Sequence, residues 1–126
     1  TAWIAISNVS DQSGPVRFLR GSNKWEKIQG MDFFNQDVIA QEAKLTKIKK
    51  NKEVINAILN MGEVSVHSSQ TYHSSLGNKE KKPRIGMVVH FRTDKSKQIK
   101  LKGEEHDYLD QIKDTSIAPI IYQKKS

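Results

Sequence analysis

Two residues in the middle of the chain are of types that could do chemistry together. His73 begins a short strand pattern, and Arg84 begins another one eleven positions later. A neutral imidazole is a good ligand for iron(II) or zinc, and a guanidinium matches a carboxylate with two parallel hydrogen bonds. The pair is compatible with a metal ion and an anion bound across the mouth of a barrel. On spacing alone, a surface histidine and an arginine at a sheet edge are the commoner arrangement.

Short apolar segments separated by turns would have to position these residues. The segments with the composition of strands are 3–9, 16–19, 54–59, 63–67, 84–91 and a short stretch around Tyr72. Turn-forming residues separate them, most densely in the Asp-Gln-Ser-Gly-Pro run at 11–15 and at 60–62. Many short strands separated by turns predict a sandwich or barrel.

The strand at 84–91 shows which side chains would share a face. Period-two alternation places Arg84 on one side with Gly86, Val88 and His90. The other side carries only apolar residues, namely Ile85, Met87, Val89 and Phe91. The strand that begins at Trp3 is also apolar on both faces. Strands of this kind need a second layer behind them.

Two further segments have helical patterns. Residues 35–45 could form an amphipathic helix, and we expect the irregular region 26–52 around it to be an insertion or lid over the mouth of the β-core. Residues 104–113 could form a second helix. The segment 118–122 is expected to be extended.

The composition limits the class of protein. A chain of 126 residues fits one domain, so we assign residues 1–126 to a single one. No apolar run reaches the roughly eighteen residues of a membrane span, and no signal-peptide pattern opens the chain. The absence of cysteine excludes disulfides and cysteine-based zinc sites. These features together favour a cytoplasmic protein without a membrane partner.

The net charge of +7 comes from 21 Lys and Arg against 14 Asp and Glu. The lysines gather in three hydrophilic stretches, 44–52, 79–82 and 95–102. No aromatic residues alternate with them, as a base-stacking platform would require. We therefore predict a solvated basic surface and no nucleic-acid partner.

Several segments, in order, resemble one enzyme family. They are WIAISNVSDQSGPVRFLRGSNKW from Trp3, GEVSVHSSQTYHSSLGN from Gly62, PRIGMVVHF from Pro83 and the closing APIIY from Ala118. This ordered set resembles the phytanoyl-CoA dioxygenase family of iron(II)- and 2-oxoglutarate-dependent oxygenases. The resemblance implies a mostly β fold with short helices, a partial double-stranded β-helix of the jelly-roll, cupin-like type.

The resemblance also implies roles for individual residues. His73 corresponds to the distal histidine of the two-histidine, one-carboxylate iron triad, and Arg84 to the arginine that binds the distal carboxylate of 2-oxoglutarate. Trp3 falls where relatives have a tryptophan lining the cosubstrate pocket, although ordinary core packing explains a tryptophan there equally well. His67 is expected in the pocket wall, and His90 as a core histidine with its hydrogen bonds satisfied.

The sequence departs from the family pattern at several positions. Asn23 replaces the histidine of a Gly-Ser-His turn, Glu63 replaces aspartate, and Ser74 replaces glycine. Val88 stands where some relatives have a hydroxyl that helps to hold the cosubstrate. Binding of 2-oxoglutarate is therefore expected to depend more on Arg84. His106 lies in a charged stretch and receives no role.

The largest departure is that no His-x-Asp motif occurs in the chain. We expect that motif shortly before Trp3 in a longer parent enzyme, so this chain would be the C-terminal part of one jelly-roll domain. The implied cofactors are Fe(II) and 2-oxoglutarate, and the implied partners are dioxygen and a small organic substrate that becomes hydroxylated. One histidine cannot hold iron tightly, so the chain alone is expected to be inactive.

Two other functions stay open, as does the state of association. A 2-oxoglutarate-dependent halogenase replaces the triad aspartate with a small residue, which would lie upstream of Thr1. A non-catalytic β-barrel binding module, for which the net charge of +7 would suit anions, is the alternative of a different class. Because strands with two apolar faces and open edges favour pairing with another chain, we expect the truncated domain to form a homo-oligomer.

Overall fold

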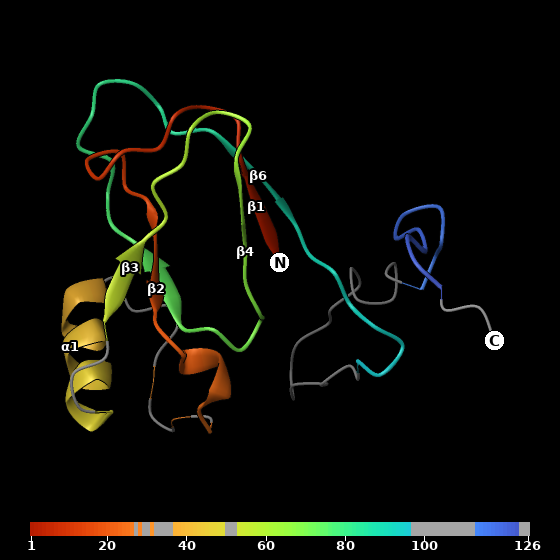
Figure 1. Ribbon diagram of the computed structural model, residues 1–126, viewed down its shortest axis with the longest axis horizontal. Coiled ribbons are helices and arrows are strands. Elements are labelled where there is room, and N and C mark those ends of the chain that lie inside the picture. The colour runs from red at the N-terminus through yellow and green to blue at the C-terminus, as the bar shows by residue number, and fades with distance from the viewer. Residues whose placement is uncertain (27, 29–30, 32–36, 50–52, 97–112, 124–126) are drawn as a thin grey trace, which may run out of the picture. The chain divides into compact units, whose positions relative to one another are not determined.

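The computed structural model describes residues 1–26, 28, 31, 37–49, 53–96 and 113–123 (Figure 1). The chain divides into two units, Thr1–Phe91 and Arg92–Ser126. The first contains every helix and strand that the structure describes. No helix among the described residues has the length and apolar character needed to cross a lipid bilayer.

The strands of the first unit form two three-stranded antiparallel sheets. In one sheet β1 (Ala2–Ala5) lies between β4 (Val64–Val66) and β6 (Gly86–Val89). In the other, β2 (Val16–Leu19) lies between β3 (Val54–Asn56) and β5 (His73–Ser75). The mostly β class predicted from the sequence is confirmed.

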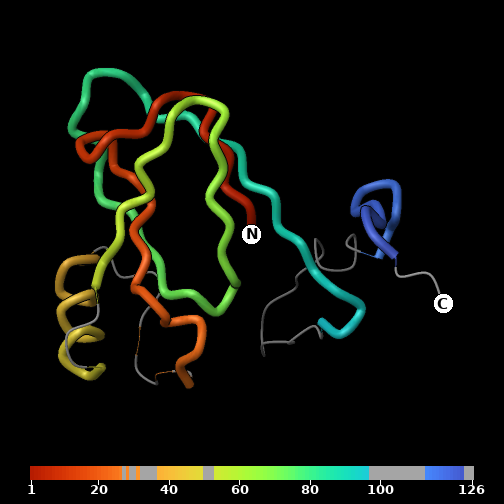
Figure 2. Tube along the Cα trace, viewed as in Figure 1, coloured from red at the N-terminus to blue at the C-terminus, as the bar shows by residue number. Residues whose placement is uncertain are grey.

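The path of the chain alternates between the two sheets. Four of the five connections between successive strands pass from one sheet to the other, and only β2 to β3 stays within a sheet. The Cα trace shows this back-and-forth course (Figure 2). Residues far apart in sequence therefore become neighbours, and each sheet combines strands from both ends of the unit.

The turn between β1 and β2 requires a glycine. Gly14 has a φ of 72°, in the left-handed region. A Cβ atom there would also lie only 2.5 Å from the backbone oxygen of Leu76. Glycine alone satisfies both the conformation and the close approach of the two chain segments.

The facing sides of the sheets follow from the strand register. Trp3 is paired with Ser65 on one side and Val88 on the other, so these three side chains share one face. Phe18 packs against the buried cluster that contains Trp3, and its ring lies 4.9 Å from that of His67. The Trp3 face of one sheet and the Phe18 face of the other therefore point toward each other.

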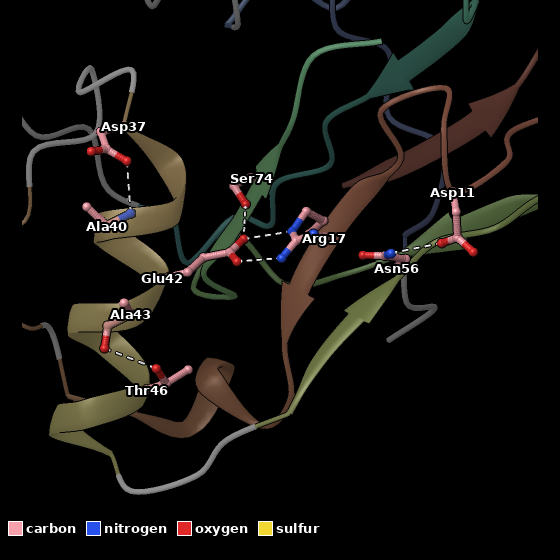
Figure 3. Close-up of polar contacts among 9 residues, drawn as sticks. All are labelled: Asp11, Arg17, Asp37, Ala40, Glu42, Ala43, Thr46, Asn56 and Ser74. Carbon is pink, nitrogen blue, oxygen red and sulfur yellow. Dashed lines mark hydrogen bonds and ion pairs between the residues drawn. The ribbon is translucent and has the colours of Figure 1, made fainter. Parts of the chain in front are cut away.

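The helix α1 (Val38–Ile48) lies on the outer face of the β3-β2-β5 sheet. Its Glu42 carboxylate accepts hydrogen bonds from Arg17 at 2.9 and 2.6 Å and from the Ser74 hydroxyl at 2.8 Å (Figure 3). Arg17 and Ser74 are register partners one residue from Phe18 and His73, so they point away from the other sheet.

Two expectations about this region are corrected. The helix begins after Asp37, whose carboxylate accepts a hydrogen bond from the Ala40 amide at 2.9 Å, rather than at residue 35. Asp37 is a good N-cap, and that signal fixes the start. α1 also backs a sheet instead of covering the mouth of the β-core, because Glu42 attaches it to the outer face through Arg17 and Ser74. The remainder of the predicted lid lies partly outside the described residues.

The second unit has no regular element among its described residues. It contains turns in which Ser96 donates to the Thr93 carbonyl at 3.0 Å and Ala118 to the Asp114 carbonyl at 2.8 Å. The predicted helix at 104–113 lies outside the described residues except for Lys113. Residues 119–123 have no assigned secondary structure, and their apolar side chains are exposed.

Candidate functional site

His73 begins β5, and its imidazole is held in one tautomer. Its Nδ1 atom lies 2.8 Å from the carbonyl oxygen of Thr71. A carbonyl can only accept a hydrogen bond, so Nδ1 carries the proton and Nε2 keeps its lone pair in the neutral ring. Metal-binding histidines commonly have a carbonyl partner of this kind on the other nitrogen. The Nε2 atom of His73 is therefore chemically suited to bind a metal.

The backbone before His73 is fixed by the turn that follows β2. Tyr72 donates its amide proton to the hydroxyl of the fully buried Ser22 at 2.9 Å, and its carbonyl accepts from Leu19 at 3.1 Å. Ser22 follows Gly21, whose φ is 74°. The sequence identified Gly21-Ser22 as a turn, but it did not indicate that Ser22 anchors the strand carrying His73.

His67 follows β4 and meets His73 from the opposite sheet. The centroids of the two imidazole rings are 4.8 Å apart, and Phe18 contacts both rings. Burial lowers the pKa of His67, and the nearby His73, the chain N-terminus and His90 lower it further. His67 is therefore neutral at pH 7.

His67 lies at the wall of a surface hollow, and its place in a cosubstrate pocket stays a prediction. It lines an open hollow of about 360 Å³ at one end of the two sheets. The other residues around this hollow are Phe18, Leu19, Arg20, Gly21, Asn23, Ile55, Val66, Ser68 and Thr71. Thr71 thus faces the hollow and also supplies the carbonyl that orients His73.

Arg84 lies against Trp3 at the start of β6. Its Cζ atom is 5.2 Å from the centroid of the indole ring, a cation–π distance. Trp3 is only 8% exposed and belongs to the core cluster. Gly86 makes room for the indole, because a Cβ atom at that position would overlap the ring. Trp3 therefore packs in the core and contacts Arg84. Its role in lining a cosubstrate pocket stays a prediction.

Buried polar atoms without hydrogen-bond partners gather on one face. Among the described residues they are the Ser65 hydroxyl, Nδ1 of His67 and Nη1 of Arg84. Ser65 in β4 is the register partner of Trp3 and shares its face, and Arg84, two residues before β6, lies against the Trp3 ring. Since buried polar groups are normally paired, this face is the part of the first unit that most lacks a polar partner. Ser65 was missed, although its spacing of two from His67 was a usable signal.

His73 and Arg84 are linked through the core rather than by direct contact. No hydrogen bond, ion pair or ring contact joins the two side chains directly within the described part of the chain. His73 is in ring contact with Phe18, and Phe18 packs against the cluster that contains Trp3, which carries Arg84. Both residues lie on the facing sides of their sheets.

Other residues singled out from the sequence have structural surroundings of their own. His90 is exposed and its Nδ1 lies 2.9 Å from the Thr1 hydroxyl, so the expectation of a core histidine is wrong. Glu63 accepts a hydrogen bond from the Asn60 amide at 2.7 Å and closes the turn before β4. Ser74 contacts Glu42 on the outer face. His106 lies outside the described residues.

A complete iron site is not present in the part of the chain that the structure describes. No group of three His, Asp or Glu residues there could hold a metal ion. His73 fits an iron ligand by its tautomer, and the partnerless Nη1 of Arg84 fits a carboxylate ligand. Among the described residues, His73 thus fits one ligand position of an iron site, and Arg84 fits the binding of one carboxylate of an organic acid.

The first unit thus combines an oriented imidazole at His73 with a guanidinium at Arg84 that has one partnerless nitrogen, in a mostly β fold. The family model of phytanoyl-CoA dioxygenase matches residues 1–86. The chain therefore belongs to the phytanoyl-CoA dioxygenase family, a family of oxygenases. No curated protein and no solved structure gives a significant match. The match includes Trp3, His73 and Arg84, whereas the closing segment 118–122 lies beyond it.

Proposed function

We propose that this chain is the C-terminal part of an iron(II)- and 2-oxoglutarate-dependent dioxygenase that hydroxylates a small organic substrate. Family membership supports the oxygenase class. The observation that carries the proposal is Arg84, a guanidinium held over Trp3 with a buried, partnerless nitrogen. A buried guanidinium nitrogen without a partner favours an anionic ligand, because a charge-assisted hydrogen bond would satisfy it.

The strand order supports a partial jelly roll. Such folds place eight strands in two facing sheets, and here the orders β4-β1-β6 and β3-β2-β5 use six. Within the described residues, β5 and β6, successive in the chain, are each paired on one side only. Two further strands, one beside each, would complete two four-stranded sheets. The strand beside β5 would lie next to His73, where further iron ligands are needed.

In this proposal the side chains of the chain have distinct tasks. His73 presents Nε2 to the iron while the Thr71 carbonyl holds the ring orientation. Arg84 binds the distal carboxylate of 2-oxoglutarate, and Trp3 supports both the guanidinium and the pocket wall. Iron(II) with 2-oxoglutarate supplies the activation of dioxygen when bound. The remaining iron ligands come from a part of the parent enzyme outside this chain.

Formation of succinate from 2-oxoglutarate by the longer parent protein tests the proposal. With Fe(II) and dioxygen, the wild type should convert 2-oxoglutarate to succinate. Arg84→Met should raise the KM for 2-oxoglutarate by at least about ten-fold, as expected for loss of a charged hydrogen bond. Lys81→Met is the control, because it removes an exposed cation that does not line the hollow beside His67. No iron-dependent succinate, or an unchanged KM in Arg84→Met, would contradict the proposal.

A further inference from the structure

The pair formed by His67 and His73 has the spacing of two imidazoles bound to one metal ion. A metal–nitrogen bond of about 2.1 Å places a ring centroid about 3.2 Å from the metal. Two imidazoles at bond angles of 90–109° then have centroids about 4.5–5.2 Å apart. The observed separation is 4.8 Å, and the planes are tilted by 52° rather than stacked.

The surroundings of the two rings also suit a metal. His73 is oriented by the Thr71 carbonyl so that Nε2 is free to coordinate. His67 lines the open hollow of about 360 Å³, and the His73 side chain is exposed, so an ion has access to both rings from solvent. The Phe18 ring contacts both imidazoles and restricts their rotamers already in the free protein. The two histidines therefore lose less side-chain entropy when a metal binds.

We infer that His67 and His73 together form a divalent transition-metal site within this chain. The site takes a metal that favours imidazole, such as Zn(II), Co(II) or Ni(II). Water or an anion completes the coordination from the open hollow. This inference goes beyond the proposed oxygenase function, because it needs neither the missing ligands nor 2-oxoglutarate. With two protein ligands the affinity is lower than that of a closed four-ligand site.

The chain supplies its own matched controls, since it has four histidines in all. His90 is exposed and bonded to Thr1, and His106 lies outside the described residues. The double variant H67Q/H73Q removes the pair, whereas H90Q/H106Q removes the same number of imidazoles and keeps the pair. Calorimetric titration with Zn(II) of the 126-residue chain compares the two.

We expect one Zn(II) per chain in the wild type and in H90Q/H106Q. In H67Q/H73Q the affinity for Zn(II) should fall by at least about ten-fold. That is the smallest loss typical when a residue that only orients a metal ligand is removed, and here the ligands themselves are removed. Equal loss in both double variants, or no binding to the wild type, would overturn the inference. If H67Q/H73Q does not fold, imidazole nitrogen NMR of the wild type decides. Zn(II) must then shift both the His67 and His73 resonances and leave His90 unchanged, and a shift of only one of the pair overturns the inference.

Discussion

The two sheets of the first unit differ in what covers their outer faces. The outer face of β3-β2-β5 carries Arg17 and Ser74, and α1 covers it through Glu42. The outer face of β4-β1-β6 is apolar and has no such cover among the described residues: Val66 is 76% exposed and Met87 50%. The β3-β2-β5 sheet is therefore the covered sheet, whereas the β4-β1-β6 sheet, the uncovered sheet, needs another layer on its outer face. The sheet without a cover is also the one that carries Trp3 and Arg84.

The largest effect should come from the uncovered sheet. Leaving large apolar side chains in water forgoes up to about 1.5–3 kcal/mol each, against a total stability of roughly 5–15 kcal/mol. We therefore predict that the 126-residue chain self-associates at micromolar concentration, and that Met87→Lys shifts it toward monomer. Light scattering measures both.

The covered sheet supplies the control for association. Ile39 on α1 is 55% exposed, so Ile39→Lys makes the same type of change outside the uncovered face and should leave the assembly unchanged. A wild-type chain that is monomeric and unfolds cooperatively would contradict this account of the uncovered sheet.

The inner face of the same sheet should be sensitive to a single methyl group. Gly86→Ala would overlap the Trp3 indole, and overpacking of this kind costs about 1–3 kcal/mol of unfolding free energy. Gly77→Ala is the control, because a Cβ there meets no atom within 4 Å. Denaturant unfolding followed by tryptophan fluorescence compares the variants, and equal stability of the two would show that Trp3 is not confined.

The covered sheet should depend on one half-buried ion pair. Glu42→Gln weakens the link between α1 and β2, and we expect a loss of roughly 1.5–3 kcal/mol, as for hydrogen bonds to charged groups. Glu53→Gln breaks the Arg20 pair, whose side chains are 70% and 61% exposed, and should cost less than about 1 kcal/mol. If the two variants lose equal stability, α1 does not hold this sheet through Glu42.

The smallest effect is a dependence on pH in the same ion pair. Burial alone would raise the pKa of Glu42, but the hydrogen bonds from Arg17 and Ser74 and the charge of Arg17 outweigh it, so the pKa is lowered. The stabilisation is thus fully present above the unfolded glutamate pKa of about 4.3 and is lost as the pH falls through the lower folded value. Wild type should lose stability in this acid range more steeply than Glu42→Gln. Parallel pH profiles of the two proteins would rule out this contribution.

The strands were predictable because alternation and turn residues are local signals. β2 was predicted at its observed bounds, and the inward side of β6 was assigned correctly from period two. The position of α1 was not predictable, because its attachment depends on Glu42 meeting Arg17, 25 residues away. The same holds for the site. His73 and Arg84 could be named from the sequence, but the approach of His67 to His73 depends on how two sheets face each other.

The proposed oxygenase activity requires His73 and Arg84 to act together, His73 on the iron and Arg84 on the 2-oxoglutarate bound with it. The direct measurement is the visible charge-transfer absorption that arises when a 2-oxo acid chelates iron(II), recorded without oxygen on the longer parent protein. We predict the band in the wild type, its loss in His73→Ala, and a need for at least about ten-fold more 2-oxoglutarate in Arg84→Met. An undiminished band in His73→Ala, at the same 2-oxoglutarate concentration as in the wild type, would contradict the assignment.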